Sequence, residues 1–480
     1  MTDTVATPSS IHARRVAALG YTGIVAVMIY FGTSSHWEDP FLVIAALAIV
    51  VLGAWPTLRW LQRNDDTYPI IEFMLLTTVP FYALPVLTGH DALGEFTEPV
   101  VLKAAFVVIT FQVAAILGGA AAARTFNEAK GIRTHWLREE VWPEQRMNFT
   151  AYTAILNTAW LFLATLVPDL VPQELFGTLR AIAFGIGIVS IFIQARLWGA
   201  GRLQTSLKVL FWVNLTVQVI LSFSSLVLIT GISLLLTAAI GYFTSSRRVP
   251  WIPLLIFIPI VGVLHQGKAP MRETYWKGLA RPPTLLELPA YFTQWVEFSL
   301  VSSDAHEEEI EGSNLTYGLM QRASLYHIVC VAVDTMPERS PFLNGESYAM
   351  LPAQFVPRFL WPTKPSPQAS VRLLAIHFGL QSEDETKTTS IGFGILSEAY
   401  ANFGYVSVAV ISFILGWLFR RLALMTAHCA TLSPAGLFRI LCLVWCFNAE
   451  GTLAIWISSF YQACIAIGIP LFGLRMFFSK

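Results

Sequence analysis

Runs of apolar residues about as long as a lipid bilayer is thick, roughly 20 residues each, recur along the chain. In lipid such runs form helices, because every backbone polar group must be satisfied within the segment. The composition agrees: of 480 residues, 55% are hydrophobic and 13% are charged, which leaves too little polar surface for a water-soluble globule. The sequence therefore predicts an all-α polytopic membrane protein.

We expect about twelve transmembrane helices of this length. They lie near residues 16–32, 41–58, 69–88, 100–122, 149–167, 177–197, 207–229, 231–245, 250–265, 395–419, 434–450 and 453–474. The first span follows two arginines without a convincing cleavage pattern, so we expect it to be retained. The predicted regions are an N-terminal bundle of about nine helices (1–265), one large loop with short helices (266–394) and about three C-terminal helices (395–480).

Lysine and arginine occur in alternate loops, which predicts the orientation because cytoplasmic loops retain these cations. One set of loops contains Arg14, Arg15, Arg59, Arg63, Arg124, Lys130, Arg133, Arg138, Arg146, Arg196, Arg202, Lys208, Arg247, Arg248, Arg420, Arg421, Arg475 and Lys480. The other set, including 34–40, 90–99 and 168–174, contains acids but no cation. Both termini are thus predicted to be cytoplasmic, with the large loop facing outward. A formal net charge of zero argues against a nucleic acid partner.

A rival topology makes residues 315–333 one more span and inverts the orientation of every segment after it. This segment contains Arg322 and His327. An arginine near the bilayer centre costs about 2.5 kcal/mol or more. We therefore expect a helix of the outer loop that lies against the membrane or the helix bundle.

The outer loop, at about 130 residues, is too long for a simple connection and is expected to be functional. Its acidic run 304–311 offers oxygen ligands for a divalent cation, but the spacing fits no calcium loop and favours a solvated segment. Cysteine usage implies no disulfide. Cys442 and Cys446 share a helix face, yet two thiols without further ligands indicate packing rather than metal binding. We predict neither a metal nor a cofactor.

The loop ends in a proline-rich strip, PAQFVPRFLWPTKPSP (352–367). Proline interrupts a helix and favours extended geometry in the residue before it. In a polyproline II conformation Arg358, Trp361 and Lys364 fall on one face, and the two cations stand about 19 Å apart, which suits two phosphates. If the strip instead folds back, both cations would serve a single phosphate site. A further alternative is that Arg358 and Trp361 anchor the loop at the membrane interface.

The tenth span begins in TTSIGFGILSEAYANFGYVSV (388–408). Glu398 and Asn402 are four residues apart and therefore share a helix face. A carboxylate buried near the membrane interface suits general-base chemistry. The alternative is that the helix dipole stabilises an acid in the first turn.

Four segments between Asn314 and Gly416 carry a family resemblance: GLMQRASLYHIV, NGESY, FVPRFLWPTKPSP and GILSEAYANFG. In this order they resemble the bacterial O-antigen or oligosaccharide repeat-unit polymerases of the Wzy type. The other spans agree only in number and hydropathy. The resemblance implies a glycosyltransferase of the bacterial inner membrane that works at its periplasmic face. It would transfer a growing glycan from undecaprenyl pyrophosphate onto the next lipid-linked repeat unit.

This reaction needs cations for the pyrophosphates, a base near the acceptor hydroxyl and a surface for sugars. The resemblance implies no metal, and it suggests a chain-length regulator and a flippase as partners. Glu398 is the first candidate base and His327 the second. The predicted pyrophosphate ligands are Arg322, Arg358, Lys364, Arg372 and Arg180. The predicted sugar contacts are Trp361, Tyr348, Tyr400 and Asn402.

Arg180, one turn inside the sixth span, either snorkels to the interface or meets a phosphate. Polar residues inside other spans are expected to form interhelical hydrogen bonds; these are Glu72, Gln112, Asn157, Asn214 and Gln218.

Three other classes of function remain open. A lipid-linked oligosaccharide flippase would place charge along a central cavity rather than in one outer loop. A glycosyltransferase that uses a polyprenyl phosphate sugar would need an acidic pair in the first outer loop, where Glu38 and Asp39 lie. The third class is a non-catalytic scaffold of an export complex.

Overall fold

The computed structural model describes residues 11–34, 37–62, 67–126, 150–166, 173–226, 228–246, 248, 250–277, 283–284, 286–307, 324–356, 360–388, 390–427, 429, 433–446 and 451–478. Every regular element in these ranges is a helix. Seven of them are long and apolar enough to cross a membrane: Arg15–Thr33, Pro40–Gln62, Ile70–Leu87, Glu98–Thr125, Ile182–Gly199, Thr205–Ser224 and Gly394–Met425. The prediction of a helical membrane protein is thus confirmed.

Shorter apolar helices occupy the positions of the other five predicted spans: Thr150–Ala164, Thr230–Phe243, Trp251–Gln266, Ala435–Trp445 and Leu453–Ile465. The count of about twelve spans remains a prediction. The chain forms two compact units, each built from separated segments. The first contains Met1–Glu139 and Met320–Tyr461, and the second contains Glu140–Leu319 and Gln462–Lys480. The predicted division at 265 and 394 refers to the membrane and stays a prediction.

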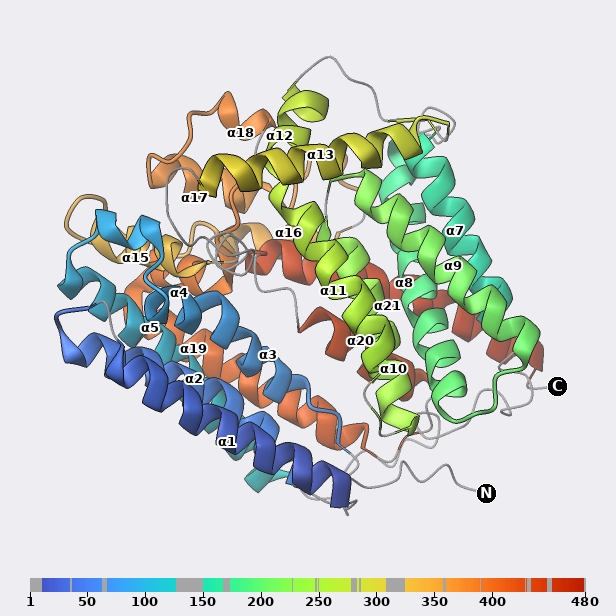
Figure 1. Ribbon diagram of the computed structural model, residues 1–480, viewed down its shortest axis with the longest axis horizontal. Coiled ribbons are helices and arrows are strands. Elements are labelled where there is room, and N and C mark those ends of the chain that lie inside the picture. The colour runs from blue at the N-terminus through green and yellow to red at the C-terminus, as the bar shows by residue number, and fades with distance from the viewer. Residues whose placement is uncertain are drawn as a thin grey trace. The chain divides into compact units, whose positions relative to one another are not determined.

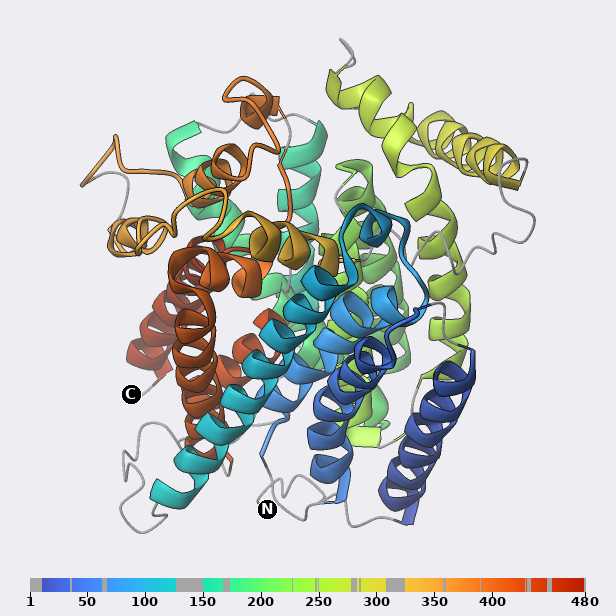
Figure 2. The ribbon, with the colours of Figure 1, turned by 90° about the vertical axis from the view of Figure 1, so that its left-hand side faces the viewer.

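The first unit begins with α1 (Ile11–Thr33), α2 (Pro40–Gln62), α3 (Ile70–Thr78), the π-helical η1 (Val79–Ala83), α4 (Leu84–Leu87), η2 (Asp91–Glu95) and α5 (Glu98–Thr125). Its later part contains α15 (Tyr326–Thr335), η6 (Tyr348–Met350), α16 (Leu351–Gln354), α17 (Ala369–His377), α18 (Glu385–Thr388), α19 (Gly394–Met425), α20 (Pro434–Trp445) and the start of α21 (Leu453–Phe478). The short helices from α15 to α18 lie at the end of the unit where α5 begins (Figure 1, Figure 2).

Two glycines let α5 and α19 approach each other closely. A Cβ atom added to Gly118 would stand 2.1 Å from the carbonyl oxygen of Phe413. One added to Gly416 would stand 2.0 Å from the carbonyl oxygen of Ala115. Small residues at such crossings bring the backbones of membrane helices into contact. Residues far apart in the sequence therefore form the main helix pair of this unit.

The helix α15 is too short to cross a membrane alone, with 10 residues. It packs on α5 and α19, and the N–H of Leu325 donates to the carbonyl of Phe81 inside η1 at 3.0 Å. The Tyr326 hydroxyl donates to the Val101 carbonyl at 2.6 Å. The described half of the segment 315–333 is thus a helix that lies against the bundle, as predicted.

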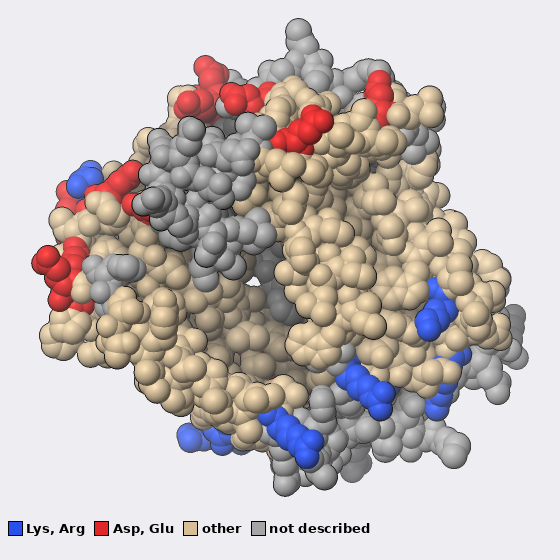
Figure 3. Space-filling view, viewed as in Figure 1, with Lys and Arg blue, Asp and Glu red and all other residues tan. Residues whose placement is uncertain are grey.

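Most acidic side chains of the first unit lie at one end and most basic side chains at the other, although Arg339 pairs with Asp334 at the acidic end at 2.9 Å (Figure 3). At one end the Glu38 N–H donates to Glu98 Oε1 at 3.2 Å. At the other, Arg420 forms an ion pair with the buried Glu72 at 3.8 Å. Figure 3 shows most acids of this part near the end that carries α15 and the basic residues mainly at the opposite end.

A buried arginine closes the C-terminal end of α19. Arg439 lies 3.8 Å from the ring of Tyr68. It donates to the carbonyls of Thr426 at 2.8 Å, Ala427 at 3.2 Å and Cys429 at 3.3 Å. A cation at this position satisfies carbonyls that have no partner within the helix.

The second unit consists of α7 (Thr150–Leu166), α8 (Gln173–Gly199), α9 (Thr205–Ser224), α10 (Leu228–Ser246), α11 (Trp251–Gln266), α12 (Lys268–Arg272), η5 (Glu273–Lys277), α13 (Leu288–Glu307) and the end of α21. Asn157 donates to Gln218 Oε1 at 2.7 Å, and Thr158 donates to Asn214. In the first unit Gln112 donates to the Ile49 carbonyl at 2.9 Å. Four of the five predicted interhelical hydrogen-bond partners are thus confirmed, and the side chain of the fifth, Glu72, forms an ion pair with Arg420.

Candidate functional site

Two of the segments that carry the resemblance meet in the first unit. The backbone N–H groups of Leu343 and Asn344 donate to the carbonyls of Ala401 at 2.9 Å and Asn402 at 3.1 Å. The N–H of Gly345 donates to the side-chain oxygen of Asn402 at 3.1 Å. Three consecutive N–H groups, those of Leu343 and of the first two residues of NGESY, therefore fasten the NGESY loop to the EAYANFG turn of α19.

The backbone conformations that allow this contact depend on glycine. In α19, Phe403 and Gly404 leave the helical conformation, and Gly404 has φ 61° and ψ −144°. This region of the backbone map is accessible essentially only to glycine. In the loop, Asn344 and Gly345 have φ 47° and 93°, and asparagine and glycine are the residues that tolerate positive φ best. Both halves of the contact are therefore specified locally by the sequence.

Glu398 and Asn402 lie at the centre of this contact and are fully buried. The amide nitrogen of Asn402 donates to Ser347 Oγ and to the Glu398 carbonyl, both at 2.8 Å. The Glu398 Oε2 atom accepts from the N–H of Leu453 at 2.6 Å. Its Oε1 atom has no hydrogen-bond partner among the residues that the structure describes. One carboxylate oxygen is thus held, and the other is left to accept a proton or a hydroxyl group.

Tyr348 completes the cluster. Its hydroxyl is buried beside the side chains of Ser407 and Asn402, and within the described ranges it meets no partner at hydrogen-bonding geometry. Burial, and secondly the nearby Glu398 carboxylate, raise the pKa of Tyr348. The hydroxyl therefore stays protonated, and it can donate to a bound oxygen.

His327 belongs to a second group of polar side chains, at the start of α15. Its ring stacks on that of His90 with the centroids 5.6 Å apart. The Nδ1 atom lies 3.4 Å from Ser324 Oγ. Burial, and secondly His90, lower the pKa of His327 to about 4, so the imidazole is neutral near pH 7. A neutral imidazole can accept a proton.

The described parts of the proline-rich strip fold back on each other, which is the second of the two predicted conformations, and do not form one extended polyproline II segment. Leu351–Gln354 forms a helical turn with Pro352 at its start, where the missing N–H has no cost. The Lys364 amine, which is buried, donates to the carbonyls of Ala353 at 3.1 Å and Val356 at 2.6 Å. The predicted spacing of about 19 Å between the cations therefore no longer applies.

The remaining predicted residues are spread more widely. Trp361 is 42% exposed and Arg372 is exposed on α17, so both are accessible to a ligand. Tyr400 is buried with its ring against Phe342 and Tyr405. Arg180 belongs to α8 of the second unit, and its side chain lies outside the described part of the chain, as do Arg322 and Arg358. These positions stay predictions.

No sequence pattern marked Ser347, Ser407 or Leu453 as members of the cluster. Serine and leucine are common, and only the fold brings Ser347 to Asn402, Leu453 to Glu398 and Ser407 to Tyr348. In the described ranges, no group of three or more His, Cys, Asp or Glu side chains has the arrangement of a metal site. A metal-independent reaction remains a prediction.

Compared with protein-family models, with curated proteins and with solved structures, the chain matches none.

Proposed function

We propose that this protein polymerises lipid-linked oligosaccharide repeat units at the periplasmic face of a bacterial inner membrane. The observation that carries the proposal is the hydrogen-bonded contact between the NGESY loop and the EAYANFG turn around Glu398. They are two of the four segments that carry the resemblance to Wzy-type polymerases, and their meeting point contains a buried carboxylate with one oxygen that has no hydrogen-bond partner among the described residues.

In the proposed reaction, a sugar hydroxyl of the acceptor repeat unit attacks the anomeric carbon of the donor glycan. The new glycosidic bond forms as the bond to undecaprenyl pyrophosphate breaks, and the hydroxyl proton passes to the base. Glu398 Oε1 is the first candidate for that base, and Tyr348 is placed to donate to a sugar oxygen. Since the cluster is enclosed, the loop that contains Ser347 has to move before a hydroxyl reaches it.

In this proposal, arginine side chains stabilise the departing pyrophosphate. Arg372 is exposed, and Arg322 and Arg358 complete the predicted set. Lys364 folds the proline-rich strip through two carbonyls, and we assign it the role of holding Arg358 and Trp361 in place. His327, neutral near pH 7, is the second candidate base.

The separation of acids from cations in the first unit supports the proposed orientation. With the end that contains Arg420 in the cytoplasm, as the distribution of cations among the loops favours, the cluster around Glu398 faces the periplasm. Both termini are then cytoplasmic.

The test is to supply the purified protein in proteoliposomes with lipid-linked repeat units and to size the glycans. A polymerase yields lipid-linked chains of two or more units together with free polyprenyl pyrophosphate. The Glu398→Gln variant should yield neither, whereas Glu383→Gln, which alters an exposed carboxylate, should behave as the wild type. Glycans that remain single units, or that only change their side of the membrane, would overturn the proposal and favour a flippase.

A further inference from the structure

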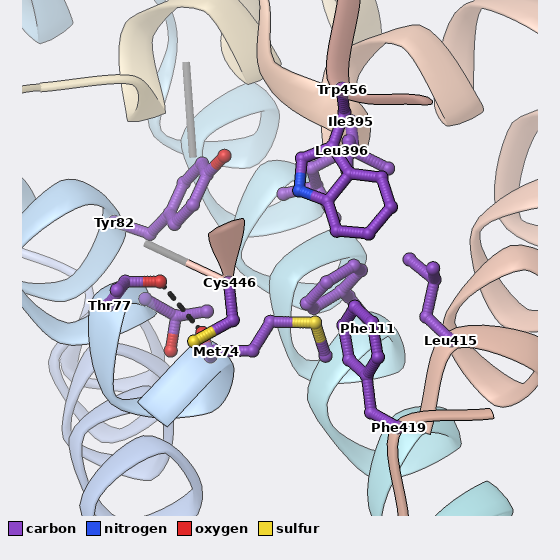
Figure 4. Close-up of a pocket in the computed structure, with 11 residues that line it drawn as sticks. Met74, Thr77, Tyr82, Phe111, Ile395, Leu396, Leu415, Phe419, Cys446 and Trp456 are labelled. Carbon is purple, nitrogen blue, oxygen red and sulfur yellow. Dashed lines mark hydrogen bonds between the residues drawn. The ribbon is translucent and has the colours of Figure 1, made fainter. Parts of the chain in front are cut away.

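The pocket that Figure 4 shows in the first unit is apolar but small, with a volume of about 40 Å³. Met74, Phe111 and Trp456 are among the side chains that line it. Such a volume has room for a few molecules the size of water and for no lipid chain. Contact with lipid therefore depends on exposed apolar side chains, and α13 of the second unit presents a set of them outside the candidate membrane spans.

The helix α13 lies across the C-terminal ends of α9 and α11 (Figure 1). The Tyr291 hydroxyl donates to the carbonyl of Ser224, the last residue of α9, at 3.1 Å. The Trp295 indole N–H donates to the carbonyl of Leu264, in the last turn of α11, at 2.7 Å. Carbonyls in the last turn of a helix have no partner within that helix. Side chains of α13 therefore satisfy the ends of two other helices of the second unit.

These contacts determine the depth of α13 relative to the membrane. The helix α9 is one of the seven that are long and apolar enough to cross a membrane. Its 20 residues extend for about 30 Å, the thickness of the hydrocarbon layer. Its last residue, Ser224, therefore lies at one boundary of that layer, and so does Tyr291, which is bonded to it. The helix α13 also has 20 residues, but it is not among the candidate spans, and we place it along the membrane surface.

Three lines of residues run along α13, since residues four apart are neighbours on a helix. The buried line, which faces the second unit, consists of Tyr291, Trp295 and Ser299. The apolar line, next to it, consists of Phe292, Val296 and Leu300. The polar line, next again, includes the exposed residues Thr293 and Glu297. A helix with this arrangement can pack on protein, lipid and water at once.

The apolar line is largely uncovered by the described part of the chain. Val296 is 39% exposed and Leu300 is 58% exposed, and Leu286, two residues before α13, is 93% exposed. Apolar side chains exposed together mark a contact with another protein or with a membrane. The depth of α13 favours the membrane, because amphipathic helices at this level bury their apolar face at the boundary between headgroups and acyl chains. We infer that the apolar line of α13 inserts into lipid at the membrane surface.

The charges of α13 indicate which force holds it there. Its sequence contains acids but no lysine or arginine. Interfacial helices that select anionic lipids have cations on their polar face. The attachment of α13 therefore depends on the burial of apolar side chains, and it should be insensitive to the charge of the lipid headgroups.

The experiment uses the full-length protein with a photoreactive diazirine amino acid in place of Val296, Leu300 or Glu297. Each protein is reconstituted into phosphatidylcholine vesicles and illuminated, so that the probe bonds to the molecule that it touches, and mass spectrometry identifies the product. Probes in place of Val296 and Leu300 should give several-fold more lipid adducts than the probe in place of Glu297. Equal numbers of lipid adducts at the three positions, or none at Val296 and Leu300, would overturn the inference.

A charge on the apolar line tests whether burial of this line causes the contact. Val296→Asp should reduce the lipid adducts of a probe in place of Leu300 several-fold, because a carboxylate is costly to bury in hydrocarbon. Val296→Ser should reduce them less. Thr293→Asp is the matched control, since Thr293 is exposed on the polar line. Thermal unfolding in detergent shows which variants are folded, and unchanged adducts in the folded Val296→Asp or Val296→Ser protein would overturn the inference.

Two further measurements separate lipid from other occupants of the apolar line. Replacing part of the phosphatidylcholine by phosphatidylglycerol should leave the yield of adducts unchanged, and a yield that requires the anionic lipid would overturn the inference. Illumination of intact cells should again give lipid adducts from the probe in place of Leu300. Crosslinks to a second copy of the chain or to another protein, without lipid adducts, would show a docking surface for protein and overturn the inference.

Discussion

The side chain of Glu398 accepts a hydrogen bond from the N–H of Leu453, the first residue of α21, at 2.6 Å. An acid at a helix N-terminus satisfies one of the unpaired N–H groups there and interacts favourably with the helix dipole. One oxygen of this carboxylate thus has a structural role, while the other has no partner among the described residues. The two roles can be separated by mutation.

Glu398→Gln should remain folded and lose polymerisation, because the amide oxygen still accepts from Leu453 but cannot take a proton from a hydroxyl. Glu398→Ala should lose both, with a stability cost of about 1–3 kcal/mol for the N–H left without a partner. Thermal unfolding in detergent and glycan sizing measure the two effects. Wild-type turnover by the glutamine variant would exclude Glu398 as the base and leave His327.

Gly404→Ala should destabilise the contact between the NGESY loop and α19. A non-glycine residue at φ 61° and ψ −144° costs about 1–3 kcal/mol, and the new Cβ would stand 3.2 Å from the Phe342 ring. Gly379→Ala is the matched control, because Gly379 also has positive φ but no atom within 4 Å of the added Cβ. We expect a larger fall in the unfolding midpoint for Gly404→Ala, together with slower polymerisation. Equal falls would mean that the Phe342 contact contributes nothing.

Alanine at Gly118 or Gly416 should separate α5 from α19. Overpacking of this kind costs about 1–3 kcal/mol, since the added Cβ would meet backbone atoms that cannot rotate away. Gly23→Ala serves as the control, because this helical glycine has no atom within 4 Å of its added Cβ. The measurement is the unfolding midpoint of each purified variant. A midpoint for Gly416→Ala equal to that of Gly23→Ala would contradict the close crossing.

Acid should destabilise the protein through His327. Its pKa lies at about 4 in the folded protein against an ordinary value of 6.5, so between these pH values the unfolded chain binds more protons. The contribution of His327 to stability is therefore complete above pH 6.5 and decreases as the pH falls toward 4.

The measurement is the unfolding midpoint at about pH 7.5 and about pH 5, on either side of the ordinary histidine pKa. His327→Asn should reduce the difference between the two midpoints. His90→Asn keeps an acceptor for the Ala92 N–H and should retain most of the difference, because burial is the larger cause of the shift. If His327→Asn retains the full difference, other groups are responsible for the acid sensitivity.

Lys364→Met should be less stable than Arg372→Met, and both variants should lose polymerisation. The first removes the donor of the Val356 carbonyl, at a cost of about 1–3 kcal/mol for an unsatisfied group, while the Ala353 carbonyl keeps the Val356 N–H as a donor. The second alters an exposed side chain and should change stability by about 0.5 kcal/mol or less. Both should leave lipid-linked single repeat units accumulating in cells, which chromatography of extracted lipids detects. Normal polymer in the Arg372 variant would remove that residue from the pyrophosphate site.

Local pattern predicted the helices and several of their polar contacts. Gln112, Asn157, Asn214 and Gln218 were recognisable as interhelical partners because a polar side chain inside an apolar run has few alternatives in lipid. The position of Glu398 and Asn402 on one face was also readable, since residues four apart are neighbours on a helix.

The proline-rich strip and the full carboxylate cluster depended on contacts between segments distant in sequence. Five prolines favoured an extended strip, but the Lys364 amine and the carbonyls of Ala353 and Val356 fold it back. Ser347 reaches Asn402 across 55 residues, as Leu453 reaches Glu398. The sequence around a serine or a leucine does not predict such a distant partner.

The close crossing of α5 and α19 also constrains how the protein is made. Gly118 and its partner Phe413 are separated by about 300 residues, which a ribosome adds in roughly 15–60 s at 5–20 residues per second. During that interval the second unit enters the membrane, and the face of α5 that contains Gly118 has not yet packed against α19. Completion of the first unit therefore belongs to the last stage of biosynthesis, and a chain truncated before α19 leaves that unit without its central helix pair.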